Sequence, residues 1–174
     1  MVIRKGNNIM ATLFLVCGIP GSGKSTFLSN FVKSPNSLII SRDKIRFSLL
    51  REGEKYFSHE PVVKQMFYSG ITKALQLGYN VFADQSSINP TFRKEILNNV
   101  RGYKEANIIW INTPIEICIK RDSKRNGRAR VGEKVIKNIY SHFVPPTFKE
   151  KFSHIYHYSN GILIEQKKGQ INIK

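Results

Sequence analysis

Residues 18–26 read Gly18-Ile19-Pro20-Gly21-Ser22-Gly23-Lys24-Ser25-Thr26, and this stretch decides the fold. It fits a pattern of one glycine, four further residues, and then Gly-Lys-Ser/Thr. Glycines in such a loop let successive backbone N–H groups turn inward onto phosphate oxygens, and the helix that follows directs its positive dipole end at the same anion. The stretch therefore predicts a loop that binds the phosphates of a nucleoside triphosphate.

The sequence on either side of this loop supports the prediction. Before it, residues 12–17 (Thr-Leu-Phe-Leu-Val-Cys) form a short apolar run that suits a buried parallel strand. After it, apolar residues recur at helical spacing between Phe27 and Val32. In this setting Lys24 would reach the β- and γ-phosphates, and Ser25 would offer its hydroxyl to Mg²⁺. We therefore expect ATP, or another nucleoside triphosphate, together with Mg²⁺.

Length and charge limit the possibilities further. The chain has 174 residues, 41% of them hydrophobic, and a formal net charge of +16. We expect one domain over residues 11–174, behind a flexible N-terminal arm at residues 1–10. A positive charge of this size suits a polyanionic partner such as nucleic acid. A lysine-rich proteome would produce the same charge without any partner, and composition leaves this alternative open, as it leaves the oligomeric state.

The expected compartment is the cytoplasm. Cys17 and Cys118 fall in elements that we expect to be buried, where they would act as small hydrophobic residues in a reducing compartment. The basic start and the apolar run from Ala11 resemble a secretory signal, but that run leads directly into the phosphate-binding loop. No segment is long enough to cross a membrane.

Strand and helix patterns alternate along the chain, which predicts an α/β fold with a mainly parallel sheet. We expect a three-layer sandwich with five strands, and residues 162–165 are a candidate edge strand in addition. Asn89-Pro90 and Thr113-Pro114 are each typical of a helix N-cap followed by proline. The expected strands are 12–17, 37–41, 80–83, 107–111 and 154–158, with helices at about 43–50, 62–77, 90–100, 114–124 and 133–143.

Aspartate is scarce, which makes its positions informative: the only ones are Asp43, Asp84 and Asp122. Ligands bind beyond the carboxyl ends of parallel strands, and Asp43 and Asp84 each follow one. Phosphoryl transfer to a hydroxyl needs a carboxylate that orients the acceptor and a group that organises the metal, roles that these two can fill. Asp43 could instead be a helix N-cap, and Asp84 a turn residue. Arg46 shares a helix face with Asp43 and could grip a neighbouring phosphate.

Positive charge is concentrated between Lys120 and Arg130. Arg121 and Arg125 are one helical turn apart and can point the same way. In P-loop kinases an arginine-bearing lid closes on the donor phosphates and neutralises charge in the transition state. We therefore expect a helical lid at about residues 120–132. The alternative is a solvated helix face whose cations are favoured by the helix dipole.

Four stretches together resemble the kinase domain of bacteriophage 5′-hydroxyl polynucleotide kinase, over roughly residues 13–148. They are residues 18–26, 41–46 (Ser-Arg-Asp-Lys-Ile-Arg), 84–89 (Asp-Gln-Ser-Ser-Ile-Asn) and 120–125 (Lys-Arg-Asp-Ser-Lys-Arg). The resemblance implies a P-loop kinase fold in which Lys24 and Ser25 hold the donor phosphates and Mg²⁺. It further implies these roles: Asp43 accepts the proton of the 5′-hydroxyl, Arg46 binds the phosphate on the 3′ side, Arg125 with Arg121 contacts the donor phosphates, and Asp84 lines the acceptor pocket.

The sequence departs from this family in two places. Lys44 follows Asp43, where the phage kinase has a second acidic residue. The phage enzyme also carries a phosphatase domain that opens with paired aspartates, and no two aspartates here are two apart, so we expect no 3′-phosphatase activity.

Together these features predict an ATP-dependent kinase that acts on the 5′-hydroxyl ends of DNA or RNA in end repair. Two alternatives remain. One is a kinase for a nucleoside, sugar or other metabolite, and the other is a nucleotide-binding nucleic-acid module with little or no ATP hydrolysis.

Overall fold

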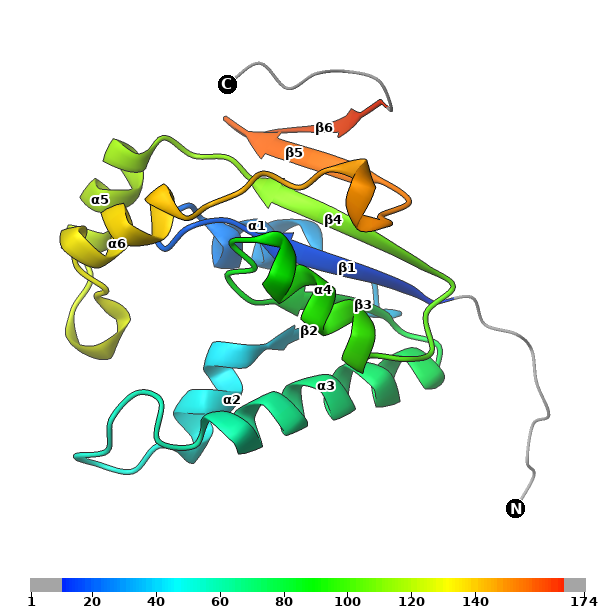
Figure 1. The fold of residues 1–174 in the computed structure, drawn as a ribbon, viewed down its shortest axis with the longest axis horizontal. Helices are drawn as coiled ribbons and strands as arrows, with labels where there is room; N and C mark the ends of the chain where they lie inside the picture. Colours follow the sequence, from blue (N-terminus) through cyan, green and yellow to red (C-terminus); the bar gives the residue numbers. More distant parts are fainter. Residues whose placement is uncertain (1–10, 168–174) are drawn as a thin grey trace.

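The computed structural model describes residues 11–167, which form one six-stranded sheet with helices on both faces (Figure 1). The strand order is β2-β3-β1-β4-β5-β6; the first five are parallel to their neighbours, and β6 is antiparallel to β5. The expected arm at residues 1–10 lies outside the described residues. The strands are β1 (Thr12–Cys17), β2 (Ser37–Ser41), β3 (Asn80–Asp84), β4 (Glu105–Ile111), β5 (Ile155–Ser159) and β6 (Ile162–Gln166).

Helices connect the parallel strands, as crossovers between such strands require. None of those within residues 11–167 is both long and apolar enough to span a membrane. They are α1 (Lys24–Phe31), α2 (Arg42–Leu49), α3 (Glu60–Gln76), α4 (Pro90–Asn99), α5 (Ile115–Ser123) and α6 (Glu133–Ser141), with short 3₁₀ turns at Gly127–Ala129 and Phe148–Glu150.

The central strand β1 is covered on both faces, because its side chains alternate between two cores. Leu13 and Leu15 pack in the larger core with residues of α3 and α4, whereas Val16 packs with Phe27 and Leu28 of α1 on the other face. The helices lie accordingly on the two sides of the sheet (Figure 1). This confirms the three-layer α/β sandwich and explains why β1 is an unbroken apolar run.

A third, smaller core lies under α5 and α6. Ile19 of the loop after β1 packs there with Cys118 of α5 and Ile136 of α6. The basic segment at residues 120–132 is thereby attached to the phosphate-binding loop, although whether it closes as a lid stays a prediction.

The sheet has six strands in the described residues, so the expectation of five was wrong by one edge strand. The candidate strand at residues 162–165 is β6, which pairs with β5 through a two-residue turn, Asn160-Gly161. Both turn residues have positive φ, 51° and 83°, and Asn-Gly is the sequence that favours such hairpin turns.

One of the two predicted helix starts was also wrong. Asn89 caps α4 as expected, because its side chain accepts a hydrogen bond from the Phe92 backbone N–H at 3.0 Å. At the other start, Pro114 rather than Thr113 is the N-cap residue of α5. The Thr113 hydroxyl instead donates to the Ser22 carbonyl at 2.8 Å, which ties this helix to the phosphate-binding loop.

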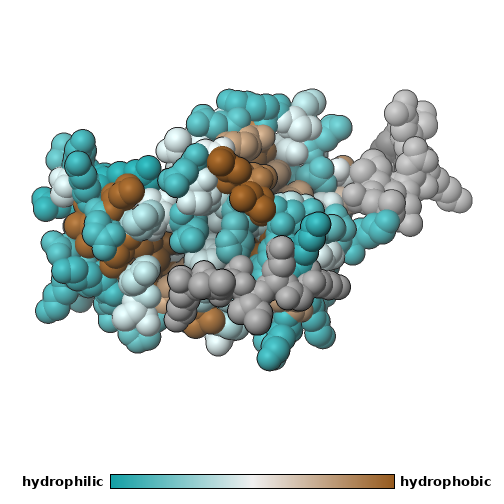
Figure 2. Space-filling model, turned by 90° about the horizontal axis from the view of Figure 1, so that it is seen from above, coloured by the Kyte–Doolittle hydropathy of each residue, from teal (hydrophilic) through white to brown (hydrophobic). Residues whose placement is uncertain are grey.

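The outer strand β6 leaves apolar side chains in contact with solvent: Ile162 is 61% and Ile164 is 60% exposed. Figure 2 views the molecule from above the sheet edge that β6 forms in Figure 1, and shows scattered hydrophobic groups on a largely hydrophilic face. Some exposed apolar side chains are expected, because a folded protein has too little polar surface to cover itself completely.

Candidate active site

The glycine-rich loop joins the end of β1 to the start of α1. Residues 18–26, which we expect to bind phosphate, span this loop and the first residues of α1. Gly21 has a φ of +80°, and a Cβ added there would lie 2.3 Å from the Cys118 carbonyl oxygen. Gly23, the N-cap of α1, has a φ of +100°. Positive φ turns backbone N–H groups toward the inside of the loop, so only glycine allows both the turn and the close packing on α5.

The Lys24 side chain folds back onto the start of this loop. Its Nζ donates to the carbonyl oxygens of Gly18 at 2.8 Å and Ile19 at 3.2 Å. Burial lowers the pKa of this ammonium group, while the nearby Asp84 carboxylate acts in the opposite direction. The buried Ser22 hydroxyl has no hydrogen-bond partner among the described residues. A cradle with a cation and an unpaired donor fits an anionic group such as phosphate.

Asp84 ends β3, next to β1, where it pairs in register with Val16. The sheet therefore places its carboxylate beside the loop, as predicted. Burial raises the pKa of Asp84, and the Lys24 charge and a hydrogen bond from Ser41 oppose that rise. Lys24 also interacts electrostatically with Asp43, so both predicted carboxylates lie within range of the same ammonium group.

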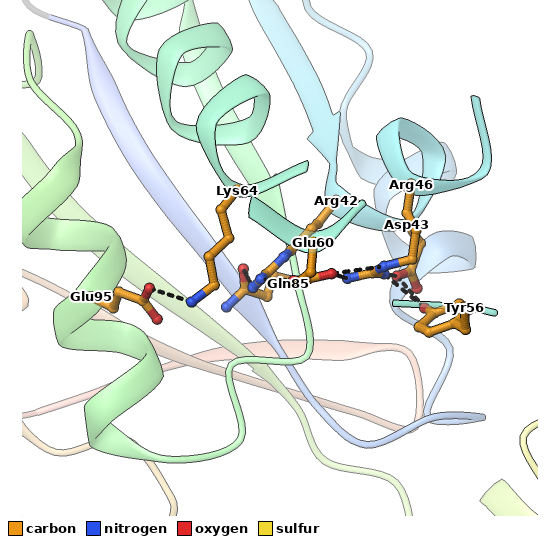
Figure 3. A network of polar contacts seen from close by, with 8 residues as sticks. All are labelled: Arg42, Asp43, Arg46, Tyr56, Glu60, Lys64, Gln85 and Glu95. Atoms are coloured by element: carbon orange, nitrogen blue, oxygen red, sulfur yellow. Dashed lines mark hydrogen bonds and ion pairs between the residues drawn. The ribbon is translucent and has the colours of Figure 1, made fainter. Parts of the chain in front are cut away.

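Asp43 and Arg46 are joined to two residues that sequence reasoning missed, Tyr56 and Glu60 (Figure 3). The Tyr56 hydroxyl donates to Asp43 Oδ1 at 2.7 Å, and Arg46 Nη1 donates to the same oxygen. Asp43 lies inside α2, whose N-cap is Ser41, so it is not the capping residue that we considered. Its side chain is 63% exposed, which leaves the carboxylate open to solvent.

Arg46, by contrast, is 5% exposed and is held on several sides. Its Nε and Nη2 donate to Glu60 Oε2 at 3.2 and 2.9 Å, and its Nη1 also donates to the Tyr56 hydroxyl at 2.8 Å. Glu60 in turn pairs with Arg42, which donates to Gln85 Oε1 at 2.8 Å (Figure 3). Arg46, which we expected to bind a phosphate, therefore also holds the Asp43 carboxylate in place.

The loop after Asp84 is fixed by a buried ion pair. Arg93 of α4 is fully buried; its Nε and Nη2 donate to Glu150 at 2.6 and 2.9 Å, and its Nη1 donates to the carbonyls of Ser87 and Val144 at 3.0 and 2.9 Å. Ser87 has a positive φ of 46°, a rare conformation for a residue other than glycine. We call these contacts the Arg93 clamp.

The two predicted lid arginines make different contacts. Arg121 Nη1 donates to the Ser22 carbonyl at 3.1 Å, and Arg125 pairs with Asp122 at 3.5 Å. Asp122, a third residue that sequence reasoning left without a role, is buried and accepts hydrogen bonds from the backbone N–H groups of Val131 and Gly132. A lone acidic residue in a basic run was the signal that could have revealed this anchor.

A cleft of about 430 Å³ opens beside the loop, between α5 and the turn that joins β5 to β6. Its lining includes Gly23, Thr26, Arg121, Arg125, Tyr158 and Asn160. The exposed Asp43 carboxylate is not part of the lining of this cleft.

Comparison with known proteins agrees with this geometry. A family model described as an AAA domain matches residues 13–146. The chain belongs to this family. Its core is a P-loop kinase domain, as its relatives indicate.

Two curated relatives are kinases. The chain is 27% identical over 143 residues to the L-seryl-tRNA(Sec) kinase of Methanococcus maripaludis, covering 79% of this chain and 54% of that protein. It is 30% identical over 145 residues to the adenylyl-sulfate kinase of Buchnera aphidicola, covering 74% of this chain and 65% of that protein. The chain thus spans about half to two thirds of the length of these relatives.

Among solved structures, the Pnkp1/Rnl/Hen1 RNA repair complex contains a chain with the same fold. The TM-score is 0.64 at 19% identity, covering 99% of this chain and 54% of that one. This likeness confirms the P-loop kinase fold that the sequence predicted.

Proposed function

We propose that this domain transfers the γ-phosphate of ATP to the 5′-hydroxyl of a DNA or RNA strand. The observation that supports this most strongly is the setting of Asp43. Its carboxylate is exposed, is fixed by Arg46 and Tyr56, and lies within electrostatic range of Lys24 in the phosphate loop. A carboxylate held between a triphosphate loop and solvent can receive an acceptor hydroxyl that arrives from outside.

In this reaction the 5′-oxygen forms a bond to the γ-phosphorus while the bond to the β–γ bridging oxygen breaks, and ADP leaves. Asp43 accepts the hydroxyl proton and later returns it to water. We assign the proton to Oδ2, because Arg46 and Tyr56 both donate to Oδ1. Fixing the carboxylate in this way aligns it for in-line attack.

The donor phosphates would lie in the glycine loop, with Lys24 on the β- and γ-phosphates. Arg121 and Arg125 would neutralise the charge that develops on the transferred group, and the cleft that they line would take the rest of the nucleotide. Ser25 is exposed in the first turn of α1 and, with Asp84 near Lys24, fits a bound Mg²⁺. The metal would supply further charge neutralisation across the phosphates.

On the acceptor side, Arg46 would serve two purposes. A guanidinium has five N–H donors, and four of those of Arg46 are engaged by Glu60, Asp43 and Tyr56 in the described structure. The fifth, on Nη2, would contact the phosphate on the 3′ side of the accepting nucleoside. The net charge of +16 supports a polyanionic acceptor, and one structural neighbour comes from an RNA repair complex.

The second candidate is a kinase for a small metabolite, which the likeness to adenylyl-sulfate kinase favours. Labelled ATP can be offered with a 5′-hydroxyl oligonucleotide, a free nucleoside or adenylyl sulfate. Transfer to the oligonucleotide supports our proposal, and transfer to a small acceptor alone supports the second candidate. ATP turnover that no acceptor stimulates contradicts both.

The Asp43→Asn variant tests the assigned base. We expect phosphate transfer to fall by about 10²–10⁴-fold, because the amide cannot accept the proton. ATP binding, followed by calorimetry, should change little, since Asp43 lies outside the glycine loop. Glu52→Gln, an exposed carboxylate in the loop after α2, is the matched control and should keep full activity. If Asp43→Asn transfers phosphate at an unreduced rate, Asp43 is not the base.

A further inference from the structure

Three exposed aromatic side chains gather beside Asp43, and the mechanism above does not use their rings. Phe47 on α2 is 40% exposed, and Tyr56 and Phe57 in the following loop are 37% and 66% exposed. The Tyr56 ring meets Phe57 edge to face with centroids 4.8 Å apart, and meets Phe47 at 5.8 Å. We call these three residues the aromatic platform. Exposed apolar groups that cluster, rather than scatter, mark binding sites.

We propose that the aromatic platform stacks the base of the acceptor's 5′-terminal nucleotide, so that this site selects strand ends that carry a base. The inference rests on the proposed function and names the part of the substrate that the kinase would recognise.

The platform is held in place before any ligand arrives. The Arg46 guanidinium lies 4.4 Å from the Tyr56 ring centre and 5.4 Å from that of Phe57, and both distances are typical of cation–π contacts. The loop itself is closed by Glu54, which accepts from the Arg51 backbone N–H and contacts His59, each at 2.8 Å. Rings that are already ordered lose little entropy when a base stacks on them.

Its position is suited to the terminal nucleotide. The Tyr56 hydroxyl lies 2.7 Å from Asp43 Oδ1, so the platform begins where the accepting hydroxyl would be bound. In a nucleotide, the base and the 5′-oxygen are attached to the same sugar, so a hydroxyl at Asp43 brings its base within reach of these rings. A sugar without a base would leave them uncovered.

Two exposed cations flank the platform, and the loop after α2 also carries Glu52 and Glu54. Lys44 directly follows Asp43, Lys55 directly precedes Tyr56, and both are exposed. Cations beside stacking rings are the combination that single-strand binding proteins use, and stacking tolerates any sequence because every base has a π face. We therefore expect little preference among the four bases and a clear preference for a base over none.

Phe57 offers the cleanest test, because it is the most exposed ring and, unlike Tyr56, does not donate to Asp43. The acceptors are two oligonucleotides with a 5′-hydroxyl, one with a normal terminal residue and one abasic at that residue. Phe57→Ala removes the ring, and Phe57→Trp keeps a stacking surface. Leu77→Ala, at a residue that is 63% exposed just after α3, is the matched control.

We expect the wild-type domain and Leu77→Ala to have a KM about tenfold lower for the normal end than for the abasic end. Phe57→Ala should remove most of this preference, so that the KM values for the normal and abasic ends become similar. Phe57→Trp should retain the preference. If Phe57→Ala still prefers the normal end as strongly as wild type, the inference is wrong.

A binding measurement separates this inference from the proposed function. An oligonucleotide with 2-aminopurine at its 5′ end loses fluorescence when that base stacks. If the wild-type domain quenches the fluorescence and Phe57→Ala does not, the platform is supported even when no strand is phosphorylated. The lack of phosphorylation would then contradict only the proposed function. No quenching by wild type, or equal quenching by both, overturns the platform whatever the kinase assay gives.

Discussion

Cys17 is the last residue of β1, directly before the glycine loop, and its side chain is completely buried. Burial raises the pKa of this thiol from 9.0 to about 12, although the positive charges of Arg93 and Lys24 oppose the rise. The thiol is therefore protonated in the folded protein throughout the ordinary pH range. The sequence suggested a small hydrophobic residue at this position, and its burial confirms that role.

This pKa shift makes stability depend on pH in a defined direction. In the unfolded chain the Cys17 thiol ionises above pH 9, whereas the folded chain keeps it neutral up to about pH 12. Because the unfolded state alone loses the proton in this window, the free energy of unfolding should decrease as pH rises through it. The slope should approach about 1.4 kcal/mol per pH unit.

Cys17→Ala should lack this component. Denaturant unfolding of both proteins between pH 8 and pH 10.5 measures the difference, and other groups that titrate there cancel in the comparison. Equal slopes for wild type and variant would mean that the thiol ionises alike in both states.

Contacts between residues that are close in sequence could be anticipated. Asp43 and Arg46 are three residues apart on one helix, so helical geometry alone predicted their contact. Glu60 and Tyr56 could not be predicted in the same way, because they reach Arg46 from α3 and from the loop before it. Two adjacent aromatic residues in a polar loop were a visible signal, but their target depends on how that loop folds back.

At the scale of elements, the Arg93 clamp connects α4, the loop after β3 and the 3₁₀ turn at Phe148–Glu150. The 3₁₀ turn is far in sequence from the other two segments, and the clamp holds all three through one fully buried guanidinium. A buried charge that loses its partner is costly, whereas replacing both partners with apolar groups can cost little.

Glu150→Leu alone should therefore lower the free energy of unfolding by about 3–5 kcal/mol, because it leaves the Arg93 charge buried without its carboxylate. Adding Arg93→Met should recover much of this loss. Calorimetric melting of the two single variants and the double variant gives the coupling energy, and Lys64→Met, which breaks a partly exposed pair with Glu95, serves as the control. Losses that simply add in the double variant would mean that the two side chains act independently.

The alternation of strands and helices was predictable, because parallel strands buried on both faces are short apolar runs with clear boundaries. The residues at which the strands and helices begin and end were less predictable. The structure extends β4 to Glu105, where the sequence indicated a start at Asn107, since polar residues at a strand end carry little pattern. At α5, packing against the phosphate loop takes the Thr113 hydroxyl that local sequence would assign to a cap.

At the scale of the whole molecule, the net charge of +16 bears on which acceptor is used. Binding of a strand releases counterions from its phosphates, and the affinity then falls steeply with salt. A small acceptor has few phosphates and shows little of this dependence.

We expect the KM for a single-stranded oligonucleotide to rise on the order of tenfold between about 50 and 200 mM salt, as contact with a few phosphates would produce. The KM for ATP should change much less, because its phosphates lie in a formed loop. Initial rates at constant Mg²⁺ measure both. An oligonucleotide KM that is independent of salt would show that the net charge does not contribute to acceptor binding.

The Arg93 clamp also sets an order for biosynthesis. The glycine loop and Asp43 leave the ribosome early, but Arg93 obtains its carboxylate only after Glu150 has been translated. Until then the Arg93 guanidinium lacks the carboxylate that pairs with it in the folded protein. A message that ends prematurely before the codon for Glu150 would accordingly give a product in which Arg93 has no carboxylate partner from this turn.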